Sequence, residues 1–597
     1  MDSKSKISLA GLGVVGVGLT LSYLFRKKIW ERVFKLTPAN YQVKVEKNLR
    51  LLMPDGVELA TDVYRPQSNQ PLPTILLRTP YGRGGTIGLP MVFISNRFAE
   101  RGYNVVCQDV RGIHGSGGEF KPFVYEKMDG QATLEWIDTQ PWSDGKVGMW
   151  GPSYLGYVQY AAAATGHTQL KALVPLVTQS NMVDLADNGH ALDTIMRWMY
   201  IIDAMSTPGL PVWERVNRVM RCEVQDKALA PGCYHLPLDT VDEVVLGKTV
   251  QFYQDWITHF HHEDDSYFQK VDLKQTIAKM PQAVHFMGGW YDLFLPGLLR
   301  DYAAQKAAGG SPYLTIHKWG HYDLAQQAGT VCEALAWFDH HLKGKTNGLP
   351  LKPVNVWVMG ADEWRGFDHW PPPSQETAYY LQGDGMGNGD GDTLSAGRLS
   401  PINPPMFDEP DQYRFDPADP TPNFAGALLS TAAGMVDNRE LEARHDVLVF
   451  TSPPLLNPLE IIGPVRAVLY VQSSSPFTDF FARLCVVEEN GRSGKRTPGR
   501  SLNLCDGLLR LEPGIGERQP DGSLRIEIDM SATAYRFQPG QRIRLQVSSG
   551  THPRIGRNLG TGEPILTSTR MVVQEQTVLH DGKRPSALFL PVFEGRG

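Results

Sequence analysis

The sequence predicts an α/β fold: a mostly parallel sheet with helices on both faces, followed by a domain built of strands. Short apolar runs alternate with helical segments between residues 74 and 316, as in parallel sheets covered by helices. Between residues 181 and 280 the strand signal disappears, which indicates an inserted helical region. From Pro353 onward, Gly and Pro separate many short β-rich runs, a pattern typical of a β-sandwich or jelly roll.

These changes of pattern divide the 597-residue chain into successive units. We expect a hydrophobic anchor with a basic flank at 1–35 and the first part of the α/β domain at 40–180. The helical insertion, which would form a cap, occupies 181–280, and the α/β domain resumes at 281–350. The jelly roll takes up 351–597.

The elements of the α/β domain follow in order. Alternation across residues 41–65, with Asp55-Gly56 as the turn, predicts a β-hairpin at the start. A Gly-, Asp- and Pro-rich segment at 383–422 predicts a long surface loop in the second domain. The strands expected after the hairpin lie at 74–77, 103–109, 146–150, 172–176, 283–287 and 313–316, with helices at 91–101 and 127–139.

Composition excludes several classes of function. The formal net charge is −6, from 58 Lys and Arg against 64 Asp and Glu, so we expect no nucleic-acid partner. The six cysteines show no C-x-x-C spacing, which argues against a zinc site or a disulfide scaffold and leaves long-range bridges open. The glycine-rich stretch at 112–118 lacks the lysine and the order of a phosphate-binding loop. We therefore expect no metal and no cofactor.

The N-terminus contains an uncharged segment at residues 7–25, with Lys4 and Lys6 before it and basic residues at 26–28. Its length approaches the ~20 apolar residues that a spanning helix needs, and no small-residue cleavage site follows it. We expect a single-pass membrane anchor, with the side of the membrane left open. The alternative is a buried helix at the edge of the enzyme.

The stretch from residue 146 to 164 is the most informative part of the chain. A short apolar strand leads into Gly151-Pro152-Ser153-Tyr154-Leu155-Gly156, and a helix of small residues follows. This order is that of the nucleophile elbow of α/β-hydrolases, although Leu155 stands where the second glycine is usual. Ser153 is therefore the candidate nucleophile. The alternative is that this serine only caps the helix.

A nucleophilic serine needs a histidine as base and a carboxylate to orient it. In α/β-hydrolases the acid and then the histidine follow the serine, each on a loop after a strand. Asp292 and His321 satisfy this order, and the long gap before Asp292 can hold the cap. The weaker alternatives are Asp301, Asp323, His317, His340 and His341.

The reaction also needs hydrogen-bond donors for the oxyanion. One expected donor is the backbone N–H of Tyr154, directly after the nucleophile. The second normally comes from the loop after an early strand, here residues 78–82, where Tyr81 could offer its phenol. A packing role for Tyr81 is the open alternative.

Several longer motifs follow one another along the chain: RTPYGR (78–83), DVRGIHGSGGEF (109–120), GMWGPSYLGYVQ (148–159), GGWYDLF (288–294), PVNVWVMGADEWR (353–365), DPADP (416–420), NLCDGLLR (503–510) and RFQPGQRIRLQVSSGTHPRIGRN (536–558). They resemble motifs of the CocE/NonD hydrolases, which are related to the X-Pro dipeptidyl-peptidases. The resemblance spans about residues 40–590 and implies an α/β-hydrolase domain, an inserted helical cap and a C-terminal jelly roll of the X-Pro dipeptidyl-peptidase type.

For the site, the resemblance implies a triad of Ser153, Asp292 and His321. It also implies that the Tyr81 hydroxyl assists the amide of Tyr154 at the oxyanion, and that Phe294 lines the acyl pocket.

The function expected from these residues is a serine esterase that cleaves small acyl esters through an acyl-enzyme. The alternatives with the same triad are an X-Pro dipeptidyl aminopeptidase and an amino-acid ester or amide acylase. Either would need carboxylates for a free ammonium group, and the cap offers Asp184, Asp193 and Asp203. An inert hydrolase fold that only binds a ligand is a third hypothesis. The expected partner is a small-molecule ester or amide; the oligomeric state is left open.

Overall fold

The computed structural model describes residues 28, 31–185, 191–259, 266–346, 348–383, 397–488 and 499–595. The anchor predicted at residues 7–25 lies outside these ranges. Within them, no helix combines the length and the apolar character needed to cross a bilayer. All six cysteines are free.

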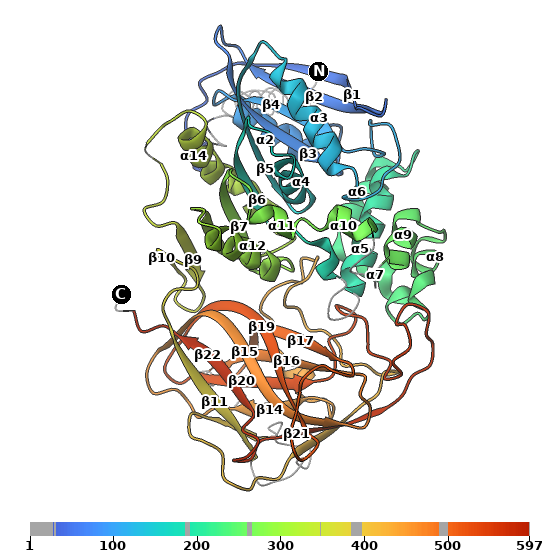
Figure 1. Ribbon diagram of the computed structural model, residues 1–597, viewed down its shortest axis with the longest axis vertical. Coiled ribbons are helices and arrows are strands. Elements are labelled where there is room, and N and C mark those ends of the chain that lie inside the picture. The colour runs from blue at the N-terminus through green and yellow to red at the C-terminus, as the bar shows by residue number, and fades with distance from the viewer. Residues whose placement is uncertain are drawn as a thin grey trace, which may run out of the picture.

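The first half of the chain forms a ten-stranded sheet in the order β1-β2-β4-β3-β5-β6-β7-β8-β9-β10 (Figure 1). The strands from β4 to β9 pair in parallel, while antiparallel pairs close both edges. This confirms the predicted α/β class. The strands are β1 Val43–Leu52, β2 Glu58–Pro66, β3 Leu72–Thr79, β4 Asn104–Asp109, β5 Ser143–Pro152, β6 Leu170–Leu176, β7 Ala283–Tyr291, β8 Tyr313–Gly320, β9 Val354–Val358 and β10 Glu363–Phe367.

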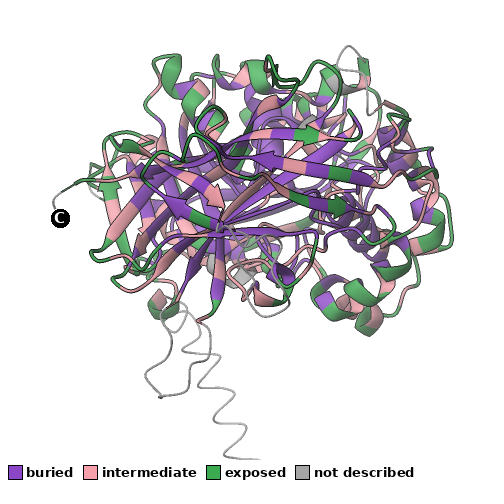
Figure 2. Ribbon diagram, turned by 90° about the horizontal axis from the view of Figure 1, so that it is seen from below, coloured by how far each residue is buried: buried purple, intermediate pink, exposed green. Residues whose placement is uncertain are grey.

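Helices cover both faces of this sheet, because its central strands are apolar on both sides. Every residue of β4 is buried, and its adjacent residues Val105 and Val106 belong to two different hydrophobic clusters. Figure 2 shows buried residues along the inner strands and exposed residues mainly in the outer helices and loops. Helices α2 (Leu89–Ala99) and α14 (Val331–His341) pack on one face, through Phe98 and Phe338 among others. The opposite face carries α3 (Glu126–Asp138), α4 (Tyr154–Ala163) and α12 (Leu295–Ala307).

The predicted helical insertion lies between β6 and β7 and forms a cap beside the sheet (Figure 1). It consists of short helices connected by loops. These are the 3-10 turns η1 Met182–Leu185 and η2 Leu238–Thr240 and the helices α5 Leu192–Ser206, α6 Val212–Met220, α7 Cys222–Cys233, α8 Val241–Leu246, α9 Gln251–His259, α10 Ser266–Val271 and α11 Lys274–Ile277. Helix α13 (Leu324–Gly329) follows β8.

The C-terminal part is a second, mostly antiparallel assembly of strands in the order β13-β21-β15-β22-β11-β12-β14-β20-β16-β17, with β19 paired to β15 and β18 to β19. These strands are β11 Gln375–Gly383, β12 Gly397–Ser400, β13 Asp411–Phe415, β14 Leu448–Thr451, β15 Leu459–Ser473, β16 Thr478–Val487, β17 Ser501–Leu511, β18 Glu517–Arg518, β19 Leu524–Phe537, β20 Arg542–Ser548, β21 Gln574–Leu579 and β22 Ala587–Val592, with the short helix α15 Arg439–Glu442.

Two details differ from the sequence prediction. The expected jelly-roll boundary at 350/351 falls before the end of the first sheet, because β9 pairs in parallel with β8, Leu314 opposite Val354. The stretch 383–422 is also not one long loop, since it contains β12 and β13.

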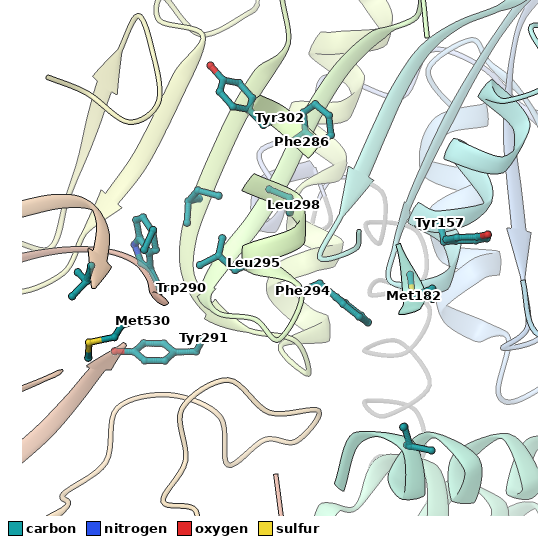
Figure 3. Packing of buried hydrophobic residues seen from close by; sticks show 14 of the residues in the cluster. Tyr157, Met182, Phe286, Trp290, Tyr291, Phe294, Leu295, Leu298, Tyr302 and Met530 are labelled. Atoms are coloured by element: carbon teal, nitrogen blue, oxygen red, sulfur yellow. The ribbon is translucent and has the colours of Figure 1, made fainter. Parts of the chain in front are cut away.

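The two strand-bearing units pack against each other at the end of β7. Figure 3 shows Trp290 and Tyr291 beside Met530 of the C-terminal assembly. Within the first sheet, the Trp290 indole donates to the Trp357 carbonyl of β9 at 2.7 Å. Across the contact between the two units, the Tyr291 hydroxyl donates to the Asn503 carbonyl of β17 at 3.2 Å. This contact fixes the β7 loop, which carries Asp292 and Phe294.

Candidate active site

Ser153 lies on a tight turn between β5 and α4. Its backbone has φ 56° and ψ −122°, a left-handed conformation that is costly for a serine, and its N–H donates to the Leu176 carbonyl at 2.9 Å. A Cβ on Gly151 would lie 2.3 Å from the Cβ of Leu155, and one on Gly156 would lie 2.3 Å from Cγ2 of Thr178. The elbow therefore requires glycine at 151 and 156, while position 155 has room for leucine.

Asp292 and His321 follow the neighbouring parallel strands β7 and β8, which brings their loops together at one edge of the sheet. His321 Nδ1 lies 2.6 Å from Asp292 Oδ2, and both side chains are buried. The Phe294 N–H donates to the other carboxylate oxygen of Asp292 at 2.8 Å, and the Gln327 side-chain amide donates to the His321 carbonyl at 2.7 Å. The carboxylate accepts from Nδ1–H, so Nε2 is the nitrogen left for proton transfer.

Tyr81 lies on the loop after β3. Its hydroxyl accepts a hydrogen bond from the Trp198 indole at 3.4 Å, and Tyr81 lines the same pocket as Ser153. Burial raises the pKa of Tyr81, while its polar contacts with Trp198 and Ser153 oppose the rise. The phenol therefore stays neutral and keeps its proton for donation. Tyr154 is the first residue of α4, so its N–H has no acceptor within the helix and is available beside the nucleophile.

The loop that carries Tyr81 is braced by residues that sequence reasoning did not assign. Arg83 pairs with Asp62 at 3.0 Å and with Asp109, and its N–H donates to Asp109 Oδ1 at 2.7 Å. His114 Nε2 lies 2.9 Å from the Pro80 carbonyl. The signal was present in the DVRGIHGSGG stretch, whose function as a brace explains its charges and glycines.

A second missed group fixes the first turn of α4. The Tyr154 hydroxyl donates to Glu126 at 2.7 Å and accepts from the Phe123 N–H at 2.9 Å, while Arg78 pairs with Glu126 at 2.6 Å. Burial raises the pKa of Glu126, and the charges and hydrogen bonds of Arg78 and Tyr154 oppose this rise. The phenol of Tyr154 thus anchors the helix end whose amide faces Ser153.

Ser153, His321, Tyr81, Tyr154 and Phe294 all line one pocket, with Asp292 directly behind His321. The structure therefore brings together the residues predicted for the triad, the oxyanion and the acyl pocket. The Phe294 ring packs edge-on against His321 at 5.4 Å. In Figure 3 it projects from the start of α12 toward Met182.

The walls of this pocket are apolar and largely aromatic. None of the described residues that line it carries a carboxylate. In the described cap, Asp193 is paired with Arg197, and Asp203 with Lys248 and Arg218. The position of the Asp184 side chain is not described. The remaining lining residues are Phe123, Met182, Leu185, Thr194, Ile195, Trp198, Trp256, Leu293 and, from the C-terminal part, Leu429.

Comparison with known proteins identifies the family. Cocaine esterase of Rhodococcus sp. (strain MB1 Bresler) is 32% identical over 597 residues, covering 94% of this chain and 100% of that protein. The chain belongs to the CocE/NonD family of serine hydrolases. Residues 55–323 match the family model of the X-Pro dipeptidyl-peptidases (S15), and residues 347–589 match the C-terminal non-catalytic domain of the same peptidases.

Solved structures with the same fold cover nearly the whole chain. An aminopeptidase from a marine sediment archaeon, Thaumarchaeota archaeon, superimposes with a TM-score of 0.75 at 22% identity, over 93% of this chain and 96% of its own. An α-amino acid ester hydrolase gives a TM-score of 0.73 at 22% identity, over 93% and 97%. As a CocE/NonD member, this protein is a serine hydrolase with esterase activity.

In the described part of the chain, His, Cys, Asp and Glu side chains form no group of three that could hold a metal ion.

Proposed function

We propose that Ser153, His321 and Asp292 form the catalytic triad of an esterase that prefers apolar or aromatic acyl groups. One observation supports this most directly: the Ser153 elbow and the Asp292–His321 pair open on a single pocket whose described walls are apolar and aromatic. Phe294 lines this pocket and packs against His321, which suits it to contact the acyl group.

The mechanism follows from the positions of these groups. Ser153 Oγ attacks the ester carbonyl carbon while His321 Nε2 takes its proton, and Asp292 stabilises the imidazolium. The Tyr154 N–H and the Tyr81 hydroxyl donate to the oxyanion. His321 then protonates the leaving alcohol as the C–O bond breaks, which leaves an acyl-serine. A water molecule, deprotonated by His321, attacks this ester, and the acid and the free serine are released.

The peptidase alternative requires a different pocket. An X-Pro dipeptidyl aminopeptidase, or an amino-acid ester acylase, must pair a carboxylate with the free ammonium of its substrate. Asp193 and Asp203 are already paired with basic side chains. Burying an ammonium in the observed pocket without a carboxylate would cost several kcal/mol of desolvation. Cation–π contacts with Phe123, Trp198 and Trp256 would return only about 2 kcal/mol of that cost.

The test compares full-length protein in mild detergent with its Ser153→Ala variant. We expect turnover of p-nitrophenyl benzoate and acetate, a loss of about 10⁴-fold or more in the variant, and little release of nitroaniline from Ala-Pro-nitroanilide. Efficient anilide cleavage would reassign the enzyme to the peptidases. Full ester turnover by Ser153→Ala would refute the triad.

The membrane anchor is a separate part of the proposal. The uncharged run at 7–25, with basic residues on both sides, supports a single-pass attachment of the enzyme. The full chain should then sediment with membranes and resist extraction by alkaline carbonate. A chain that lacks residues 1–27 should remain in the supernatant, and equal behaviour of the two chains would refute the anchor.

A further inference from the structure

The cap contributes a polar contact to the oxyanion loop. Trp198, on α5, points its indole Nε1 at the Tyr81 hydroxyl, 3.4 Å away. Tyr81 and Ser153 line the same pocket. Tyr81 belongs to the α/β domain and Trp198 to the inserted cap, so this contact joins the two units at the reacting serine.

The Trp198 ring has little freedom to leave this position. It stacks on Trp256 at 5.8 Å with an interplanar angle of 7°, on Tyr154 at 6.3 Å and 13°, and on Phe123 at 6.2 Å and 15°. Such a stack holds the plane of the indole and therefore the direction of its N–H. The donor is thus fixed before substrate binds.

The chemistry of the two groups decides the direction of the hydrogen bond. An indole N–H can only donate, whereas a phenolic oxygen both accepts and donates. When Tyr81 accepts from Trp198, its own proton points away from the indole and is free to donate within the pocket that Ser153 also lines. Accepting this bond also makes the phenolic O–H a stronger donor, because hydrogen bonds in a chain polarise one another.

We infer that Trp198 is a positioning residue of the oxyanion hole, whose indole N–H orients and polarises the Tyr81 hydroxyl. The inference rests on the proposed function, in which Tyr81 donates to the oxyanion. The cap then does more than shape the pocket: it supplies a hydrogen bond that acts on the transition state through Tyr81.

The test is a double-mutant cycle with Tyr81→Phe and Trp198→Phe on p-nitrophenyl benzoate. We expect Tyr81→Phe to lower kcat by about 10²- to 10³-fold. A hydrogen bond donated to Tyr81 strengthens the Tyr81 donor by roughly 10–30%. Losing that share of the free energy that Tyr81 contributes to transition-state binding should lower kcat about two- to eightfold in Trp198→Phe. In the Tyr81→Phe background, Trp198→Phe should leave kcat unchanged, since the group through which it acts is gone.

Changes in KM separate an effect on the shape of the pocket from the effect on the Tyr81 hydroxyl, which should appear in kcat. Any effect of Trp198→Phe on pocket shape should alter KM by the same factor in both backgrounds. Leu429→Ala is the matched control, because Leu429 lines the same pocket but is not one of the rings that stack on Trp198. Its effect should fall on KM and should combine with Tyr81→Phe as independent factors.

Two outcomes would overturn the inference: an equal loss of kcat from Trp198→Phe in both backgrounds, or no loss in either. A Tyr81→Phe variant with wild-type kcat would instead refute the oxyanion assignment itself. If Trp198→Phe fails to fold, the benzothiophene analogue of tryptophan at position 198 replaces only the N–H by sulfur and keeps the ring shape. It should reproduce the same loss of kcat.

Discussion

Gly156 is packed as tightly as Gly151 at the elbow, which makes it a sensitive probe of the site. An added Cβ would lie 2.3 Å from Thr178 Cγ2 and 2.7 Å from Thr178 Cβ, against an ordinary contact of at least 3.4 Å. The Gly156→Ala variant must therefore move the start of α4 by about 1 Å, and with it the Tyr154 N–H. A displacement of that size costs about 10²-fold in rate, and overpacking costs about 1–3 kcal/mol of stability.

The measurements are kcat and KM on p-nitrophenyl benzoate and the free energy of unfolding in urea. Adding Thr178→Ala to Gly156→Ala removes the 2.3 Å contact and should restore part of both losses. Gly130→Ala, in α3, is the control, because its Cβ would meet its nearest neighbour, an Ala162 methyl, at 3.6 Å. Wild-type kcat in Gly156→Ala, or no recovery on adding Thr178→Ala, would refute the reasoning.

Three further predictions concern other parts of the molecule. Asp292→Asn keeps the shape of the site but favours the wrong histidine tautomer, so kcat at pH 7 should fall by about 10⁴-fold, whereas an unchanged value would exclude Asp292 as the triad acid. Phe294→Ala opens the acyl pocket and should raise KM for p-nitrophenyl benzoate more than for the acetate; equal changes would place Phe294 outside the acyl pocket. The buried His580 lies between Asp408 and Asp411, at 3.0 and 2.9 Å; burial lowers its pKa, but the two carboxylates outweigh this effect and raise it. Because the folded pKa is raised, protonated His580 stabilises the fold below the unfolded pKa of about 6.5, and this stabilisation is lost as the pH rises through the folded pKa. The free energy of unfolding in urea should therefore decline above neutral pH. His580→Gln should remove that part of the decline.

The α/β domain was predictable because its signals are local. The strand at residues 103–109 is an apolar run that is buried on both faces, and the observed β4 (Asn104–Asp109) coincides with it. Which sheet β9 and β10 join could not be predicted, because their alternating pattern suits either sheet and only the pairing of Leu314 with Val354 decides it. Similarly, β12 is only Gly397–Ser400, and its pairing with β11 and β14 is long-range information.

The site residues also fall into those that the sequence predicts and those that only the structure reveals. Ser153, Asp292 and His321 were predictable, since chain order and a position after a strand are visible in the sequence. Glu126 was not, because nothing in a helical Glu predicts that it is buried beneath Tyr154. The same holds for Trp198, whose partner Tyr81 is more than a hundred residues away in the chain.

The C-terminal part takes a direct part in shaping the site, even though its family model is named for a non-catalytic domain. Leu429 lines the pocket beside Leu293 and Phe294. The loop that carries Phe294 is held by the Tyr291 hydroxyl on the Asn503 carbonyl. A change at this interface therefore acts on the acyl pocket and on the Asp292 loop together, without touching the serine. The pocket is thus built by three units at once: the α/β loops, the cap through Trp198, and the strand domain through Leu429.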